Sequence, residues 1–115
     1  MKVAQVRRFA LSLPEVSEEP HFEYSSFRVR GKIFVTVPPD ETHIHVFVGD
    51  DAREMALLRH PDFLEKLLWG RKVCGLRVHL AAALPSVVNH LIRDAWTRKA
   101  PKRLAATLAG LEASS

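Results

Sequence analysis

Cysteine and glycine are both scarce in this sequence, with one Cys and five Gly among 115 residues. The single cysteine, Cys74, excludes an internal disulfide, and a reducing cytoplasm is the compartment that we expect. The scattered glycines form neither a phosphate-binding loop nor a dinucleotide fingerprint, and no nucleophile elbow or His-Glu-x-x-His motif is present. These absences leave no sequence-based reason to propose an enzyme, and we expect neither catalytic residues nor a cofactor.

Long apolar runs are missing too. No segment approaches the roughly 20 apolar residues that a membrane helix needs. The first residues mix basic with apolar side chains, whereas a secretory signal keeps its basic head apart from its apolar block. We expect no membrane span and no signal peptide. The hydrophobic and charged fractions, 47% and 26%, are those of a globular protein, and the length suits a single domain over residues 1–115.

Basic residues outnumber acidic residues modestly, 17 to 13, which gives a formal net charge of +4. That excess favours attraction to nucleic acid or to an acidic protein partner. It is also common among soluble proteins that have no such partner. The positions of the basic residues must therefore carry the argument.

Four helices are predicted from apolar spacing and from helix-start signals. The first runs from Val3 to Leu13 and ends before Pro14. The second begins after Asp50 or Asp51, because either side chain can accept backbone N–H bonds at a helix start. Its expected apolar residues are Met55, Leu58 and Phe63. The last two begin at Pro85 and Pro101. Their apolar stripes are Val88, Leu91, Ile92, Ala95 and Trp96 in one and Leu104, Leu108 and Leu111 in the other.

Alternating apolar and polar residues predict the strands. The predicted ranges are Ser26–Arg30, Lys32–Val37, Thr42–Val48, Lys66–Trp69 and Val73–Leu80, of which Lys66–Trp69 can equally extend a helix. The proline-bracketed segment 14–22 is predicted as a loop, with its acids Glu15, Glu18 and Glu19 solvated or paired with Arg7 or Arg8. This order of elements predicts a two-layer α+β fold, in which helices pack on one face of an antiparallel sheet of four to five strands.

The strand register decides which side chains share each face of the sheet. A three-residue loop over residues 30–32 puts Val29 opposite Ile33 and Phe27 opposite Val35. The apolar face is then Phe27, Val29, Ile33, Val35, Val37, Ile44, Val46 and Val48. The reverse face carries Arg28, Arg30, Phe34, Thr36, His43, His45 and Phe47, joined by Arg77 and His79 from the last strand. Cys74 falls with the apolar face, where a thiol is buried and inert.

The reverse face combines aromatic, cationic and histidine side chains, and several uses fit it. Nucleic-acid bases can stack on Phe34 and Phe47 while cations bind phosphates. Alternatively, Phe34, His43, His45 and Phe47 form a patch for a protein partner or a small ligand. A third use is a three-His zinc site of His43, His45 and His79, but no carboxylate is evident to orient these rings, and we assign no metal. A solvated sheet face is the alternative to all three.

Basic residues gather at two predicted turns. The first hairpin carries Arg28, Arg30 and Lys32, the corner between the last two helices carries Lys99, Lys102 and Arg103, and Arg77 on the last strand is a weaker candidate. Both clusters suit contacts with phosphates. The alternative is a solvated surface, in which the cations at the end of the third helix complement its dipole.

Several stretches of the sequence resemble the MmcQ/YjbR family. LSLPEVSEEPHFEYSSFRVRGKIF, residues 11–34, is similar to the family's opening, with a helix ending in Leu-Pro and a Phe-x-Val-x-Gly-Lys-x-Phe hairpin. HPDF and LRVHL resemble its middle, and DAWTRKAPKRLAA resembles its end. The likeness spans about residues 5–108, and KLLWGRKVCGL, residues 66–76, departs from it.

The resemblance implies a fold similar to that of CyaY and frataxin. It also implies a DNA-binding function, in which two β-hairpins, called a double wing, flank the contact surface. It supplies no catalytic residue. The iron binding of frataxin is not expected, because the first helix carries Lys2, Arg7 and Arg8 rather than an acidic ridge.

Our leading hypothesis is a cytoplasmic, non-enzymatic protein, monomeric or weakly dimeric, that binds nucleic acid. Duplex DNA is the expected partner, held mainly through its phosphates. The competing hypothesis is a protein-interaction or small-ligand module that uses the aromatic and histidine face.

Overall fold

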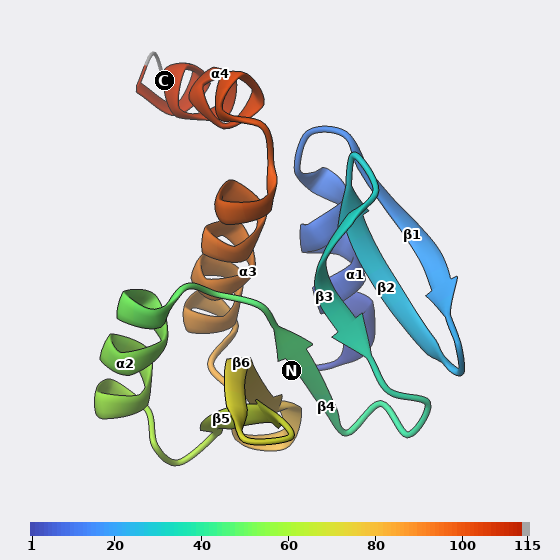
Figure 1. Ribbon diagram of the computed structural model, residues 1–115, viewed down its shortest axis with the longest axis vertical. Coiled ribbons are helices and arrows are strands. Elements are labelled where there is room, and N and C mark those ends of the chain that lie inside the picture. Colours follow the sequence, from blue (N-terminus) through green and yellow to red (C-terminus); the bar gives the residue numbers. More distant parts are fainter. Residues whose placement is uncertain (114–115) are drawn as a thin grey trace.

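The computed structural model describes the backbone of residues 1–113 and the side chains of residues 1–110. In chain order the elements are α1 (Val3–Ser12), β1 (Val16–His21), β2 (Tyr24–Val29), β3 (Lys32–Val37), β4 (His43–Val46), α2 (Asp50–Arg59), β5 (Leu64–Trp69), β6 (Lys72–His79), a 3-10 turn (Leu80–Ala82), α3 (Pro85–Lys99) and α4 (Lys102–Ala113) (Figure 1). The α+β class is therefore confirmed, with β1 added to the four to five strands predicted.

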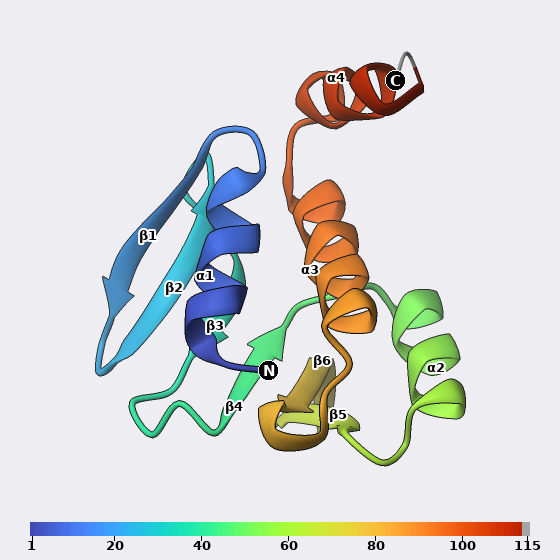
Figure 2. The ribbon, with the colours of Figure 1, turned by 180° about the vertical axis from the view of Figure 1, so that it is seen from behind.

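The six strands form one antiparallel sheet in the order β1-β2-β3-β4-β6-β5, so β1 and β5 are its two edges. Helices α1 and α3 pack against one face, and α2 packs against β5 and β6 (Figure 2). In both views α4 continues beyond the end of α3, away from the strands. The opposite side of the sheet, which we call the second face, is thus left to the strands and their turns.

Strand β1 occupies most of the segment that we predicted as a loop. The prediction failed because β1 itself has one apolar residue besides its proline, Val16, and contains Pro20, which is tolerated only at a sheet edge. A carboxylate holds β1 to the helix layer: Arg7 of α1 binds Glu18 at 2.9 Å, and the Ser25 hydroxyl donates to Glu18 at 2.6 Å. The predicted pairing of this acidic segment with Arg7 is therefore confirmed.

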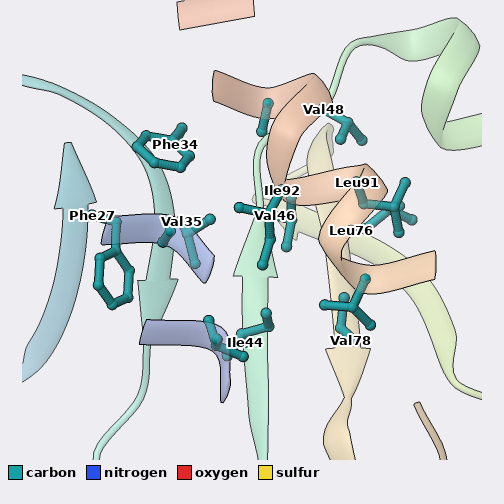
Figure 3. Close-up of a cluster of buried hydrophobic side chains, with 14 of the residues drawn as sticks. Phe27, Phe34, Val35, Ile44, Val46, Val48, Leu76, Val78, Leu91 and Ile92 are labelled. Carbon is teal, nitrogen blue, oxygen red and sulfur yellow. The ribbon is translucent and has the colours of Figure 1, made fainter. Parts of the chain in front are cut away.

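A β-bulge changes the register predicted for the first hairpin. Phe27 lies opposite Val35 as expected, but Arg28 pairs with Ile33, and Val29 pairs with Lys32. Phe34 is the additional residue in β3, and a bulge places two successive side chains on one face. Both Phe34 and Val35 are accordingly buried in the core (Figure 3). The placement of Phe34 on the reverse face is therefore wrong, and so is that of half-buried Ile33 among the core residues.

A second bulge falls between β5 and β6, where Leu67 pairs with Gly75 and Leu68 pairs with Val73. Cys74 is the additional residue here. It is only half-buried, and its thiol donates to the Leu67 carbonyl at 3.6 Å on the second face. The prediction of an inward-facing Cys74 is therefore wrong.

Gly75 allows β6 to approach β4 closely. A Cβ atom at this position would lie 2.5 Å from the Val46 carbonyl oxygen and 3.1 Å from the Phe47 Cα atom. No side chain fits there unless the backbone moves. Glycine is thus required for the contact between the two halves of the sheet.

The helices bury the residues predicted for α3 but not those predicted for α2. The whole predicted α3 stripe is buried, and the Trp96 indole N–H donates to the Pro14 carbonyl at 3.1 Å. In α2 the N-cap is Gly49, without a side-chain hydrogen bond, and Met55 and Leu58 are exposed. That helix instead buries Ala56 and Arg53, whose guanidinium binds two carboxylates.

Phe63 and the apolar stripe of α4 are the remaining residues that were predicted to be buried by helices. Phe63 is buried as expected, although it lies just before β5 rather than in α2. Leu104 and Leu108 of α4 pack against the core, while the side chain of Leu111 lies outside the described residues. No helix in the described chain is long and apolar enough to cross a membrane.

Candidate ligand hollow and basic edge

A row of polar side chains crosses the second face from one edge of the sheet to the other. Direct cross-strand partners form it, in the order Glu65, Arg77, His45, Thr36, Ser26 and Glu19. Its central members are buried: Ser26 is 0% exposed, Thr36 4% and His45 8%. The second face is therefore neither bare nor a solvated sheet surface at its centre.

His45 is the most constrained member of this row. Its Nδ1 atom lies 3.2 Å from the Thr36 hydroxyl, whereas Nε2 is buried without a hydrogen-bond partner among the described residues. Burial, together with the charges of His43 and Arg77, lowers the pKa of His45 to about 4. At neutral pH the ring is therefore uncharged and keeps one nitrogen free to bond a ligand.

Arg77 lies beside His45 in the next strand and is also incompletely bonded. One terminal nitrogen is 3.5 Å from Glu65 Oε1, which is long for a hydrogen bond, and Nε is buried without a partner in the described structure. Glu65 is meanwhile bound by His79 Nε2 at 3.0 Å. The guanidinium thus retains donor capacity toward the second face.

The three histidines of the zinc hypothesis do come near one another. The His43 ring centroid is 5.3 Å from that of His45 and 6.3 Å from that of His79. Each ring, however, already bonds a different neighbour, namely Thr42, Thr36 or Glu65. Within residues 1–110 no group of three or more ligating side chains is arranged to hold a metal ion.

Exposed aromatic residues flank the polar row and enclose a hollow of about 370 Å³. Phe22, at the β1–β2 turn, is 93% exposed, and Trp69, at the end of β5, is 82% exposed. The hollow is lined by His21, Phe22, Tyr24, Thr36, His45, Phe47, Leu67, Leu68, Trp69, Cys74 and Arg77. We refer to this set as the second-face hollow. Large apolar side chains at two hairpin tips, rather than in the core, are otherwise unexplained.

Part of this site follows from the sequence. His43, His45 and Phe47 do belong to the second face, with His45 and Phe47 lining the hollow, whereas Phe34 does not. Sequence reasoning missed the aromatic walls. The available signal was the position of Phe22 and Trp69 beside turns, where exposed polar residues are usual.

The predicted phosphate-binding cations divide into two groups. Arg28 donates to the Ser26 hydroxyl at 3.0 Å and to the Pro20 carbonyl at 3.2 Å, on the second face. Arg30 forms a two-bond ion pair with Glu15, at 3.0 and 3.1 Å. With Arg77 directed toward Glu65, these three arginines each already have partners within the chain.

The other four cations come from the β2–β3 turn and from the corner between α3 and α4. Lys32, at the start of β3, lies near Lys99, at the end of α3, and Lys102 and Arg103 follow in the first turn of α4 (Figure 1). Burial lowers the pKa of Lys99, and the positive charges of Arg98 and Lys32 lower it further. No ion pair found in the described part of the chain involves these four residues. We call Lys32, Lys99, Lys102 and Arg103 the basic edge.

Comparison with known proteins gives a family and a fold. The model of a family described as YjbR matches residues 11–98. Among solved structures the chain is similar to the crystal structure of Deinococcus radiodurans protein DR2400, whose domain is described as DUF419, with a TM-score of 0.71 and 17% sequence identity. The match covers 84% of this chain and 77% of that one. No curated protein matches the sequence.

Proposed function

This chain belongs to the YjbR family, and on that premise we propose that it is a non-enzymatic protein that binds nucleic acid, chiefly duplex DNA, through the phosphate backbone. The basic edge is the contact surface. The observation that carries the proposal is that Lys32 of the first hairpin lies near Lys99 at the end of α3, with Lys102 and Arg103 following at the start of α4.

The convergence of these cations favours an external anion over a purely solvated surface. Like charges that gather without forming ion pairs repel one another, and the lowered pKa of Lys99 reflects part of that cost. A phosphate backbone removes the repulsion and releases its own condensed counterions. The cations of the basic edge, three of them exposed and Lys99 half-buried, can contribute to such a contact.

The phosphate contacts are therefore expected at the basic edge and not on the second face. Arg28 and Arg30 each already use two of their five N–H donors within the chain, and the charge of Arg30 is balanced by Glu15. We therefore expect the basic edge to dominate the affinity.

Fluorescence anisotropy with a labelled duplex of about 20 base pairs, titrated at several salt concentrations, tests the proposal. Four phosphate contacts predict a slope of log affinity against log salt of about −3.6, since each contributes about −0.9. Reversing two charges, Lys102→Glu with Arg103→Glu, should reduce the slope by about half and weaken binding strongly.

The matched control is Arg8→Glu, which reverses an exposed charge on α1. It should change the affinity only slightly, through the net charge. The absence of binding even at low salt would refute the proposal, as would equal losses in the basic-edge and α1 variants.

A further inference from the structure

We propose that the second-face hollow binds a small, planar aromatic molecule that carries a carboxylate, independently of the basic edge. The rings of the ligand would lie between the aromatic hairpin tips, and its carboxylate would face Arg77 and His45. This site is separate from the nucleic-acid surface, so the two proposals can fail separately.

The floor of the hollow supplies the polar contacts. His45 is more than nine-tenths buried, and among the residues that the structure describes neither its Nε2 atom nor the buried Nε atom of Arg77 has a hydrogen-bond partner. Leaving such atoms unbonded is costly in a folded protein, and a ligand that bonds them recovers that cost. The two residues are direct cross-strand partners and both line the hollow, so one ligand can contact both.

The charges that face the hollow favour an anionic group. Arg77 is a fixed cation, and His45 is neutral at neutral pH because of its burial. Glu65, the carboxylate that pairs with Arg77, lies 3.5 Å from it, which is a long contact, and it also bonds His79. A guanidinium pairs best with a planar carboxylate, which can displace so long a contact by a shorter one.

The walls of the hollow favour flat rings. Phe22 and Trp69 come from hairpins at opposite ends of the sheet, and Tyr24 and Leu68 complete the apolar rim. Aromatic faces of this kind stack on planar ligands, and such exposed side chains lose apolar contact with water when covered. A peptide or protein partner would need a larger flat area than two hairpin tips provide.

The size of the hollow limits the ligand. A volume of about 370 Å³ is within the range of small-molecule sites. One water molecule occupies ~30 Å³ in the liquid, so the hollow has room for on the order of a dozen groups of that size. Two fused rings with one carboxylate fit this space, whereas a dinucleotide does not.

The experiment uses 1-naphthoate as the probe and its uncharged amide, 1-naphthamide, as the matched control. Binding is followed by the amide and indole resonances of the ¹⁵N-labelled full chain. The chain has two tryptophans, of which Trp69 lines the hollow and Trp96 is completely buried in the core. The Trp69 indole signal should therefore shift saturably with naphthoate, and the Trp96 signal should not.

Two variants locate the site. Arg77→Gln should weaken naphthoate binding by about tenfold or more, the effect of losing one charged hydrogen-bond partner. Trp69→Ala, at a surface position where folding is not at risk, should weaken it severalfold. Arg8→Gln, on the other side of the sheet, should leave it unchanged.

The outcomes are distinct. Saturable binding that needs both the carboxylate and Arg77 supports the proposal. No saturable shift at millimolar naphthoate overturns it, and so does binding that survives Arg77→Gln or that is equal for the amide. A single-stranded oligonucleotide that shifts Trp69 when naphthoate does not would also overturn it, and would assign the hollow to nucleic-acid bases instead.

Discussion

Acidification should destabilise this protein through His45, and the size of the effect can be worked out from the structure. Burial against Thr36, with His43 and Arg77 nearby, lowers the pKa of His45 from 6.5 to about 4 in the folded state. As the pH falls below about 6.5, the unfolded chain takes up a proton that the folded chain refuses. The stability is therefore present above about pH 6.5 and is lost progressively toward about pH 4.

Between about pH 7 and about pH 5 the expected loss is about 2 kcal/mol, since each unit of pKa difference is worth about 1.4 kcal/mol. Urea unfolding followed by circular dichroism at both pH values measures the loss. Carboxylates that titrate nearby also contribute, so the informative quantity is the difference from a His45→Gln variant. That variant should lose about 2 kcal/mol less over the same interval.

His90→Gln is the matched control, because His90 is a solvent-exposed histidine on α3 whose side chain is 73% exposed. Its loss of stability between about pH 7 and about pH 5 should exceed that of His45→Gln. Equal pH dependence in the natural chain and in His45→Gln would refute the reasoning. A His45 ring resonance that titrates near pH 6.5 would refute it equally.

Two further predictions concern the packing of the sheet and of the helix layer. Gly75→Ala should destabilise the fold by about 1–3 kcal/mol in urea unfolding, because its Cβ meets the β4 backbone. Gly110→Ala, where no described atom outside the helix lies within 4 Å of the added Cβ, should be neutral or stabilising by up to about 1 kcal/mol. Trp96→Phe should cost about 1–3 kcal/mol through the lost bond to Pro14 and the space left behind, whereas Trp69→Phe should cost almost nothing. Equal effects within either pair would contradict the burial on which these estimates rest.

Much of the fold is predictable because its periodicity is strong. The α3 stripe repeats at helical spacing and is buried as predicted, and the pairing of Phe27 with Val35 follows from simple alternation. The family resemblance is likewise confirmed by the match over residues 11–98. In these segments local pattern and tertiary packing agree.

The errors in the sheet have two physical causes. Each bulge adds one residue to a strand, and one added residue reverses the alternation beyond it; Phe34 and Cys74 were misplaced for this reason. Strand β1 was missed because an edge strand needs little apolar surface and accepts Pro20. The hollow escaped prediction because its walls come from hairpins far apart in the sequence.

The two edges of the sheet differ in their exposure to a second chain. Edge β1 contains a proline and two glutamates, which discourage strand pairing. Edge β5 has no proline and ends in exposed Leu68 and Trp69, with Glu65 and Lys66 as its only charges. At high concentration, self-association should therefore begin at β5. A ligand in the hollow would cover part of that edge, and it would therefore reduce self-association of the protein.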